Sequence, residues 1–448
     1  MSALAKLLRS QRFEVSGSDL ADSTRLHQLA ELGCRIFVGH EVENVVDSEL
    51  VAFSSAVAED NVELEAARER GLEVWNRARL LAALLDSRQT LVISGTHGKT
   101  TTTALAAHVL THAGLDPLAL IGGKAGNFED NLRLGEGPWT VVEADESDGT
   151  FLELHPDIAI VTNVDCDHVE FYRDFEGLKE AFGQFCRQSR LVIMNGDDPP
   201  SQAVMRAMYY EKLQGASTPE VRIYSIADPR ADVSAMDIRA EGEGMVFDVY
   251  RSRASQGIVR LPMRGFHNVS NCLAVLTAGF EIGLDLETMA EAVAGFRGVG
   301  RRFEAVGDHG GALVVDDYAH HPAEIAATLR AAKSSNPRRV ICVFQPHRYS
   351  RIRALNGAYC TAFGDADYLF VTRIYSAGEK ALNGVTGERL AERIRAAAPN
   401  AEVRYRPMLS EVLDDLRELV EPGDLVITMG AGDVWKIARS LVSGEPLA

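Results

Sequence analysis

Residues 90–113 run from an apolar, β-branched segment through a glycine-rich loop into an alanine-rich stretch. The loop at residues 95–101 reads GTHGKTT, between a strand predicted at 90–93 and a helix predicted at 104–113. Strand, glycine loop, Lys-Thr and helix is the layout of a phosphate-binding loop, in which backbone N–H groups face phosphate oxygens. The generic motif has a glycine five residues before Gly98, where this chain has Ile93. Both flanks and the Lys-Thr pair are in place, so we predict a site for ATP and Mg²⁺.

In loops of this kind the lysine, here Lys99, reaches the outer phosphates, and the hydroxyl of the next residue, Thr100, ligates Mg²⁺. The residues predicted to hold the nucleotide are Gly95, Thr96, His97, Gly98, Lys99, Thr100 and Thr101.

Composition narrows the classes of protein that fit. A chain of 448 residues is long enough for two to three domains. A net charge of −18 without a basic run argues against nucleic acid as a partner. The six cysteines are scattered without a CxxC pair, which is typical of reduced thiols in the cytosol. No apolar run is long enough to cross a membrane, and residues 1–9 lack the apolar core of a signal peptide. We expect a cytoplasmic protein, either a monomer or a homodimer.

Alternating helices and short apolar strands predict an α/β protein with parallel, helix-covered sheets in three domains, at 1–80, 81–297 and 298–448. An alternating apolar and polar stretch at 221–263 predicts antiparallel strands at one sheet edge. Glycine-rich residues 298–302 are predicted to be a hinge. The remaining strands are expected at 13–15, 36–38, 51–53, 72–75, 140–143, 158–162, 191–194, 313–316, 339–344, 368–372 and 424–429. Helices are expected at 2–11, 24–32, 62–70, 267–282 and 286–295.

Two acidic segments directly follow predicted strands. Residues 142–148 read VEADESD and residues 163–168 read NVDCDH. Because the carboxyl ends of parallel strands meet at one sheet edge, both segments are expected beside Lys99, where Mg²⁺ ligands belong. Glu143 and His168 are the predicted metal-shell residues, although histidine is unusual for Mg²⁺. The alternative for either segment alone is a solvated acidic loop.

Three further polar segments open or end predicted elements. Asn268 and Asn271 share one helix face, with amides suited to an adenine edge, although helix N-capping explains them as well. Residues 316–322 read DDYAHHP and residues 345–351 read QPHRYSR. In the second of these, His347, Arg348 and Arg351 can bind a carboxylate through forked donors. The alternatives are that these arginines contact ATP phosphates, or that the segment is a solvated basic loop.

These segments together resemble the Mur ligases, the ATP-dependent amide-bond formers of peptidoglycan precursor synthesis. The resemblance covers the whole chain. The segments that carry it read GTHGKTTTTAL, VVEADESDGTFL, IVTNVDCDH, FHN-x-x-N, GRRFE, VVDDYAHHPAEI, FQPHRYSR and TMGAGD. It implies a Rossmann-like N-terminal domain, a central phosphate-loop ATPase domain and a Rossmann-like C-terminal domain.

Within this family, VSGSDL at 15–20 and FSSAV at 53–57 match the first domain of the member that adds L-alanine. The resemblance implies that the lactyl carboxylate of UDP-N-acetylmuramate is activated as an acyl phosphate and then attacked by L-alanine. It assigns catalysis to Lys99, Glu143, His168 and His320, and the metal to Thr100, Glu143 and His168. It assigns the nucleoside to Asn268, Asn271 and Tyr318, and the amino-acid carboxylate to His347, Arg348 and Arg351. It assigns the UDP-sugar to Ser16, Ser18, Asp19, Ser54 and Ser55.

The chain departs from the family pattern at two places. The first domain of the family begins with a strand and a glycine-rich loop before a Met-Ser-x-x-Ala helix, and this sequence begins at that methionine. Either the recorded start lies downstream of the true one, which we favour because every later motif is intact, or the chain is short and binds UDP-sugar poorly. The second departure is Ile352, where the family has threonine. The alternative functions are a ligase that recycles the whole tripeptide, and a nucleotide-binding protein without ligase activity.

Overall fold

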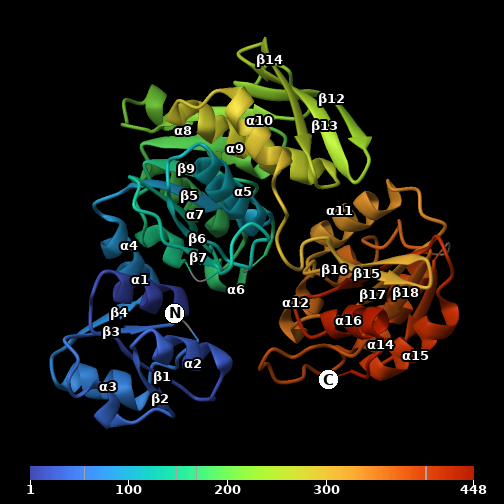
Figure 1. The fold of residues 1–448 in the computed structure, drawn as a ribbon, viewed down its shortest axis with the longest axis horizontal. Coiled ribbons are helices and arrows are strands. Elements are labelled where there is room, and N and C mark those ends of the chain that lie inside the picture. The colour runs from blue at the N-terminus through green and yellow to red at the C-terminus, as the bar shows by residue number, and fades with distance from the viewer. Residues whose placement is uncertain (55, 148, 168, 399–400, 448) are drawn as a thin grey trace. The chain divides into compact units, whose positions relative to one another are not determined.

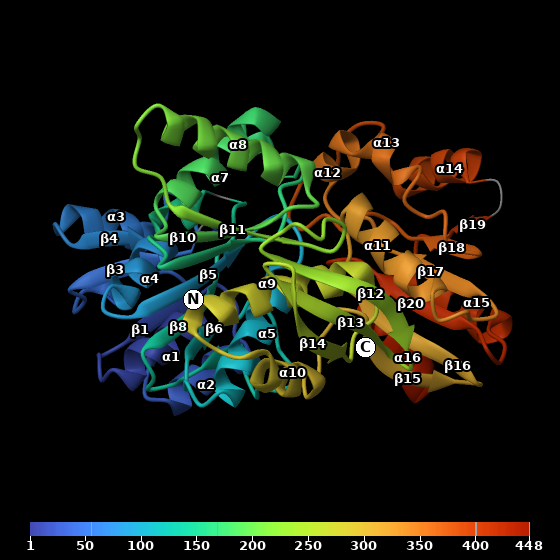
Figure 2. The same ribbon diagram turned by 90° about the horizontal axis from the view of Figure 1, so that it is seen from above.

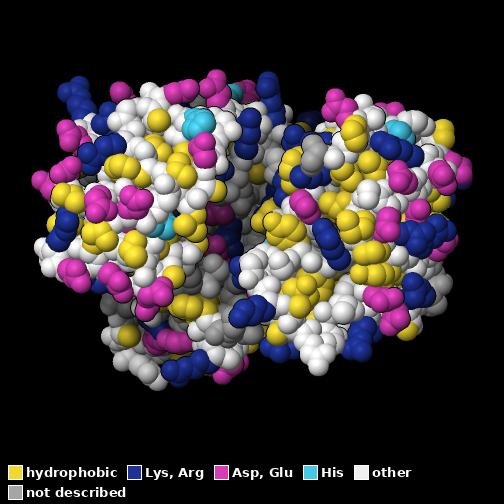
Figure 3. Space-filling model, turned by 90° about the horizontal axis from the view of Figure 1, so that it is seen from below, with side chains coloured by type: hydrophobic (Ala, Val, Ile, Leu, Met, Phe, Trp, Pro, Cys, Tyr) yellow, Lys and Arg dark blue, Asp and Glu magenta, His cyan; other side chains and the backbone are white. Residues whose placement is uncertain are grey.

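The computed structural model describes residues 1–54, 56–147, 149–167, 169–398 and 401–447. Its residues form two compact units. One comprises residues 1–236, 248–258 and 270–293, and the other comprises 237–247, 259–269 and 294–448. Within the described ranges, no helix is both long enough and apolar enough to cross a membrane. The face in Figure 3 carries acidic and basic side chains interspersed with apolar ones.

The N-terminal part of the first unit alternates helix and strand, as predicted. Its strands form two separate parallel pairs, β1 with β2 and β3 with β4, and no described strand joins them. The elements are α1 (Ser2–Ser10), β1 (Ser16–Asp19), α2 (Thr24–Glu31), β2 (Arg35–Val38), η1 (Val42–Val45), β3 (Leu50–Phe53), α3 (Val62–Glu69), β4 (Glu73–Asn76) and α4 (Arg77–Leu85).

The strand predicted at 13–15 is wrong, because these residues follow the turn that ends α1. Arg12 adopts a left-handed conformation with φ of 68°. The N–H group of Phe13 donates to the carbonyl of Leu8 at 3.0 Å. That bond satisfies one of the carbonyls that a helix C-terminus leaves open, so β1 begins only at Ser16.

The larger sheet has the order β14-β13-β12-β11-β10-β9-β5-β8-β6-β7, and its strands from β5 to β11 lie in the first unit. β5 lies between β8 and β9 and is parallel to both. The strands are β5 (Gln89–Ser94), β6 (Leu118–Leu120), β7 (Leu132–Arg133), β8 (Trp139–Glu143), β9 (Ile158–Val161), β10 (Leu191–Asn195), β11 (Glu220–Ser225), β12 (Val233–Glu241), β13 (Gly244–Arg251) and β14 (Ala254–Leu261). The helices are α5 (Lys99–His112), η2 (Thr150–Glu153), α6 (Val169–Tyr172), α7 (Phe175–Arg187), α8 (Pro199–Leu213), α9 (Phe266–Ile282) and α10 (Leu286–Ala294).

Helices cover both faces of this sheet, as Figures 1 and 2 show, with α7 and α8 on one face and α5, α9 and α10 on the other. Side chains on both faces of the central strands therefore contact apolar layers. Val92, Val142 and Val161 pack with Phe182 and Phe185 of α7 in one core. Since both faces are buried, the central strands read as continuous apolar runs, which is why the sequence located them well.

The helix that follows the phosphate-type loop begins at Lys99, five residues before the start expected from its alanine content. Threonine is β-branched and a weaker helix former than alanine. Thr102 and Thr103 are nevertheless fully buried in α5, and their hydroxyls donate to the carbonyls of Gly98 and Lys99. Burial and these internal bonds override the local preference.

The edge strands from 221 to 263 differ from the prediction in one respect. β11 is parallel to β10 and also pairs in parallel with β12. The helix α8 supplies the crossover connection that two parallel strands need. Only the strands after β12 are joined by two-residue connections, at 242–243 and 252–253, which are short enough for antiparallel hairpins.

The second unit holds a sheet in the order β15-β16-β20-β17-β18-β19, parallel except for the β15–β16 hairpin. The sequence missed the two edge strands, β15 and β19, because they are half-exposed and lack a continuous apolar run. Residues 298–302 lie outside helices and strands. The strands are β15 (Glu304–His309), β16 (Ala312–Asp317), β17 (Val340–Phe344), β18 (Tyr368–Val371), β19 (Glu402–Tyr405) and β20 (Leu425–Met429). The helices are α11 (Pro322–Lys333), α12 (Tyr349–Ala354), α13 (Asn356–Tyr359), α14 (Gly387–Ala397), α15 (Leu409–Leu419) and α16 (Trp435–Ser443).

Two aspartates of the first unit cap helices, and one of them also holds the loop after β9. Asp198 accepts from the Ser201 N–H group at the start of α8 and also from the Val164 N–H group of that loop. Asp174 caps α7 through the Gly177 N–H group. We expect Asp174→Ala to lower the free energy of unfolding by about 1 kcal/mol. We expect Asp198→Ala to lower it by about 2 kcal/mol, because this variant also loses the bonds from the Val164 N–H group and the Ser201 hydroxyl. Hydrogen exchange of the helix amides measures both, and equal effects would contradict the second role of Asp198.

Candidate active site

The loop after β5 is built around two glycines with positive φ, Gly95 at 129° and Gly98 at 80°. A side chain at Gly95 would collide with the Thr162 hydroxyl, and a Cβ at Gly98 would lie 2.6 Å from Oδ1 of Asn271. Only glycine fits these positions. Gly98 immediately precedes α5, so the loop delivers the chain into a helix N-terminus with unpaired N–H groups. A loop of this geometry can hold an anion, and the phosphate site expected here stays a prediction.

The segment after β9 holds this loop from the side. The side-chain oxygen of Asn163 accepts from the His97 N–H group at 2.9 Å, and its carbonyl accepts from the Thr96 N–H group at 3.1 Å. The Thr162 hydroxyl donates to the His97 carbonyl at 2.6 Å. An oxygen of Asp165 lies 3.0 Å from Nε2 of His97. The second predicted acidic segment thus supports the loop, whatever else it binds.

The Lys99 ammonium lies inside the loop rather than pointing into solvent. It donates to the carbonyls of Gly95 at 2.7 Å and Thr96 at 3.2 Å, and to Oε2 of Glu146 at 2.7 Å. Burial lowers the pKa of Lys99, but the charges of Glu146, Asp145 and Glu143 outweigh burial and raise it overall. The ammonium therefore stays charged at neutral pH.

Thr100 and Glu143 meet as an oxygen pair. The Thr100 hydroxyl donates to Oε1 of Glu143 at 3.0 Å, and Oε2 of Glu143 accepts from the Gly122 N–H group at 2.8 Å. Hydroxyl and carboxylate oxygens are the donors that Mg²⁺ prefers, so this pair fits the predicted ion. His168, the third predicted ligand, lies outside the described residues. Thr101 is buried within α5.

The two asparagines of the FHN-x-x-N segment both lie within α9, which begins at Phe266. Neither is therefore the residue that precedes the helix, and the N-capping interpretation is wrong. Asn271 lies against Gly98, beside the phosphate-type loop. Asn268 donates from its amide to the carbonyl of Arg264 at 2.7 Å.

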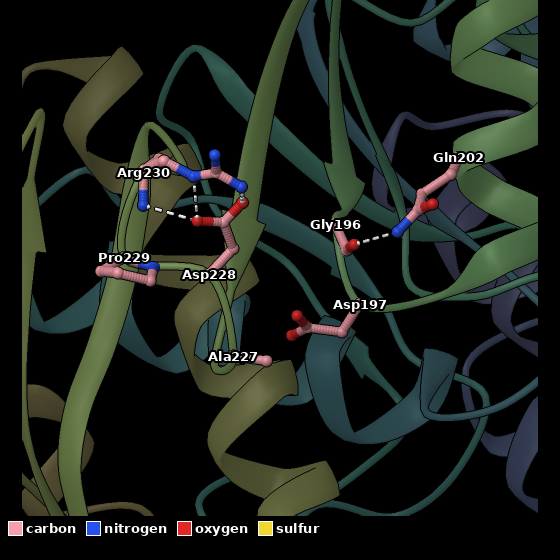
Figure 4. A pocket seen from close by; sticks show the side chains of 7 residues that line it. All are labelled: Gly196, Asp197, Gln202, Ala227, Asp228, Pro229 and Arg230. Carbon is pink, nitrogen blue, oxygen red and sulfur yellow. Dashed lines mark hydrogen bonds and ion pairs between the residues drawn. The ribbon is translucent and has the colours of Figure 1, made fainter.

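An open pocket of about 580 Å³ lies at the same sheet edge, beyond the ends of β10 and β11 (Figure 4). In it, Asp228 and Arg230 point toward each other and form a bidentate ion pair. Gln202 reaches across to the carbonyl of Gly196. None of the residues predicted from sequence lines this pocket, and its charged groups are already paired. The lining residues are Gly196, Asp197, Gln202, Ala227, Asp228, Pro229 and Arg230.

The N-terminal strands carry a separate polar cluster. The Ser18 hydroxyl donates to Oε2 of Glu63 at 2.6 Å and lies 3.1 Å from Nδ1 of His40. Asn44 donates to the other oxygen of Glu63 at 2.7 Å. Ser18 was predicted from its motif, whereas Glu63, His40 and Asn44 were not, because they come from two other segments, around η1 and at the start of α3.

Among the described residues, no side-chain hydrogen bond links the other residues predicted to bind the UDP-sugar to the cluster around Ser18. Ser16 lies at the start of β1. Asp19 accepts from the Ala21 N–H group, and Ser54 accepts from the Ala56 N–H group. Ser55 lies outside the described residues.

In the second unit, β16, β20 and β17 are neighbours, so the segments that follow them meet at one edge. Tyr318 packs against two guanidinium groups, with Arg301 at 4.9 Å and Arg302 at 5.2 Å from its ring centre. Arg301 also binds Asp316 at 2.9 Å and the carbonyl of Gly430 at 2.6 Å. Burial, partly offset by Arg302, raises the pKa of Asp317 to about 6.

His320 and His347 lie on the same edge, with ring centres 5.9 Å apart. Nδ1 of His320 lies 3.1 Å from the carbonyl of Tyr318. The His347 ring stacks on Tyr375 at 5.6 Å, and its Nδ1 lies 3.5 Å from Nη1 of Arg351. Burial first, and then Arg351 and Arg348, lowers the pKa of His347 to about 4, so this ring is neutral at pH 7.

Arg348 and Arg351 lie three residues apart in the chain, Arg348 directly before α12 and Arg351 within it. Arg348 has a positive φ of 63°, and its N–H group donates to the carbonyl of Tyr375 at 2.9 Å. Its Nε is buried without a hydrogen-bond partner among the described residues. A buried guanidinium nitrogen of this kind leaves a donor for an anionic ligand.

The motifs recognised in the sequence contain Glu146 and Arg301, but neither residue was predicted to have a role. Glu146 was passed over because three carboxylates follow β8 within a few residues, and the sequence does not say which one points inward. Arg301 was passed over because it lies in a segment interpreted as a hinge. One signal could have pointed to Glu146, because a buried lysine needs a buried carboxylate to balance its charge.

The sequence models of three protein families match three consecutive segments of the chain. The description "Mur ligase family, catalytic domain" matches residues 1–89, "Mur ligase middle domain" matches 93–279, and "Mur ligase, glutamate ligase domain" matches 301–432.

Individual relatives resemble the chain along almost its whole length. It is 42% identical to the UDP-N-acetylmuramate–L-alanine ligase of Oleidesulfovibrio alaskensis, over 99% of this chain and 96% of that protein. It is 45% identical to the enzyme of the same name from Symbiobacterium thermophilum, over 98% and 91%. The crystal structure of UDP-N-acetylmuramate-alanine ligase from Thermotoga maritima superimposes with a TM-score of 0.81 at 30% identity, over 99% and 96%.

This similarity extends through both described units and confirms the α/β, three-domain fold predicted from the motifs. With the phosphate-type loop, the acidic edge and the arginine segment all in place, this chain belongs to the Mur ligase family.

Proposed function

We propose that this chain is an ATP-dependent ligase that joins L-alanine to the lactyl carboxylate of UDP-N-acetylmuramate in peptidoglycan precursor synthesis. Relatives of that name share more than 40% of its residues over almost its full length. The observation that carries the proposal is the cradle of Gly95, Gly98, Lys99 and Thr100, with Glu143 bonded to Thr100. This arrangement suits the activation of a carboxylate by ATP.

The chemistry follows from the poor reactivity of a carboxylate. A lactyl carboxylate oxygen attacks the γ-phosphorus of ATP, the bond to the β-phosphate oxygen breaks, and an acyl phosphate and ADP form. The amine of L-alanine then attacks the acyl carbon, phosphate leaves, and the nitrogen loses a proton. The loop N–H groups and Lys99 hold the phosphates and offset their negative charge as it moves.

Thr100 and Glu143 are the residues proposed to hold Mg²⁺, together with His168. Their oxygen pair has the donor chemistry that this ion requires. Bound there, the ion supplies positive charge against the phosphate oxygens. Asn271, against Gly98, and Asn268 and Tyr318 are the residues proposed to contact the nucleoside.

We assign the carboxylate of L-alanine to Arg348 and Arg351, with His347 beside them and His320 on the same edge. The Nε of Arg348, which is buried and has no hydrogen-bond partner among the described residues, supports this assignment. Because His347 is neutral at pH 7, the positive charge there comes from the two arginines. A planar guanidinium pairs with a carboxylate through two parallel bonds.

The division of labour among domains is part of the same proposal. Residues 1–80 bind the UDP-sugar through the segments containing Ser16, Ser18, Asp19, Ser54 and Ser55. Residues 81–297 bind ATP, and residues 298–448 bind L-alanine. Since these sites belong to different parts of the chain, turnover requires that the three ligands be brought together. The free cysteines suit a cytoplasmic enzyme.

The first test is ADP release with Mg²⁺, ATP, UDP-N-acetylmuramate and L-alanine, each omitted in turn. We expect release only when all four are present, because the acyl phosphate forms only when the carboxylate meets ATP. The L-alanyl tripeptide replaces L-alanine in a parallel assay. Acceptance of the tripeptide alone would identify a recycling ligase, and ATP binding without ADP release would identify a nucleotide-binding protein.

The second test is Lys99→Ala. We expect ADP release to fall at least about 100-fold, since the variant removes a charged donor aimed at the transferred phosphate. Lys212→Ala, at an exposed position at the end of α8, is the matched control and should leave the rate unchanged. Near-normal turnover of Lys99→Ala would move the phosphate site elsewhere.

The third test compares two arginines of α12. Arg351→Ala should raise the KM for L-alanine about 10- to 100-fold, the range for a lost charged hydrogen bond, with a smaller change in the KM for ATP. Arg353→Ala, exposed on the same helix, is the control. An effect of Arg351→Ala confined to the KM for ATP would assign this arginine to the nucleotide instead.

A further inference from the structure

Glu146 is a buried carboxylate that none of the assigned roles uses. It lies three residues beyond the end of β8, and only 1% of its surface is exposed. Its backbone carbonyl accepts from the Tyr172 hydroxyl and from the Gly149 N–H group, which fixes the turn that aims the side chain inward. A carboxylate is buried in this way only when a charged partner compensates for lost hydration.

The charged partner of Glu146 is Lys99. With this contact, all three N–H donors of the lysine have acceptors. An ammonium group has three N–H bonds. In this structure Lys99 has three acceptors, the carbonyls of Gly95 and Thr96 and Oε2 of Glu146. Glu146 therefore takes the place beside Lys99 that a phosphate oxygen takes in a loaded loop of this type.

The other oxygen of Glu146 supports the same view. Oε1 is buried and has no hydrogen-bond partner within the part of the chain that the structure describes. Burial raises the pKa of Glu146 even though Lys99 opposes that shift. The ion pair is thus incompletely satisfied, and a competing anion or an added cation can displace it more easily than a fully bonded pair.

The carboxylates around Lys99 oppose the binding of a polyphosphate. Glu143, Asp145 and Glu146 all act on this one ammonium. A phosphate chain that enters without a cation meets three carboxylates and competes with one of them for the lysine. A divalent cation at the Thr100–Glu143 oxygen pair offsets that repulsion and leaves Lys99 free to exchange partners.

We propose that Glu146 is a positioning residue that occupies Lys99 in the nucleotide-free enzyme and thereby makes nucleotide binding depend on a divalent cation. The inference rests on the proposed function, because it takes the loop at 95–101 to be the ATP site. Glu146 acts through Lys99 and makes no contact with the reacting atoms.

The experiment measures ATP binding by calorimetry to the full chain, with Mg²⁺ and with EDTA, in the wild type and in three variants. Glu146→Gln keeps the shape of the side chain and removes its charge. Asp145→Asn is the matched control, since it removes the same charge from a half-exposed side chain whose oxygen lies 3.9 Å from Lys99. Glu146→Asp keeps the charge and shortens the side chain, so it should restore the dependence on Mg²⁺ at least in part.

We expect Glu146→Gln to tighten metal-free ATP binding by about tenfold, or ~1.4 kcal/mol, and Asp145→Asn by less than about threefold. The ratio of affinities with and without Mg²⁺ should narrow only in Glu146→Gln. A residue with a merely structural role would weaken ATP binding when replaced, not strengthen it. Thermal unfolding of each variant checks that it is folded.

Three results would overturn the inference. These are equal effects of Glu146→Gln and Asp145→Asn, weaker metal-free binding by Glu146→Gln, and an unchanged ratio of affinities in that variant. If Glu146→Gln does not fold, unchanged dependence on Mg²⁺ in Glu146→Ala would overturn the inference as well. The proposed function is tested separately on the wild type, by its binding of ATP with Mg²⁺ and by its ADP release with L-alanine.

Discussion

The parallel pairing of β5 with β8 on one side and β9 on the other is the constraint on which the candidate active site depends. It brings three loops, distant in sequence, to one edge of one sheet. The loop after β5 supplies the cradle, the loop after β8 supplies Glu143 and Glu146, and the segment after β9 supplies Thr162 and Asn163. Because both faces of these strands are buried, a slip by one residue would exchange the side chains packed on the two faces and disrupt both apolar layers.

The second unit repeats this solution with a different chemistry. There β20 lies between β16 and β17, and all three run parallel. The edge gathers guanidinium groups and imidazoles in place of a glycine cradle. Arg301 shows how closely this edge is held together, since it bonds to Asp316 near the end of β16 and to the Gly430 carbonyl directly after β20. Two sheets of one design thus offer one edge suited to phosphate and another suited to a carboxylate.

Much of this was accessible from sequence, because buried parallel strands leave a continuous apolar signal and the groups that bind ligands follow them directly. The strands before the phosphate-type loop and before the acidic and arginine segments were all located. The failures have physical causes. The strand expected at 13–15 was displaced by the turn that ends α1, and the parallel course of β11 follows from α8, whose crossover role sequence periodicity does not reveal.

Side-chain partnerships were the harder part of the prediction. Three carboxylates after β8 look alike in the sequence, and only the structure distinguishes buried Glu146 from half-exposed Asp145. The cluster of Ser18, His40 and Glu63 likewise joins distant segments through hydrogen bonds that no local pattern encodes. Local rules predict where a polar group lies along an element, whereas long-range packing decides which group it meets.

The close approach of Gly98 to Asn271 has a consequence for how this enzyme can change over evolutionary time. A Cβ at position 98 would lie 2.6 Å from the Asn271 side chain, so no larger residue can arise there while the asparagine remains. A smaller residue at 271 would remove the clash but leave a left-handed backbone that still disfavours any side chain at 98. Position 98 is therefore constrained twice, by its own backbone and by Asn271, whereas its glycine sets no such limit on position 271.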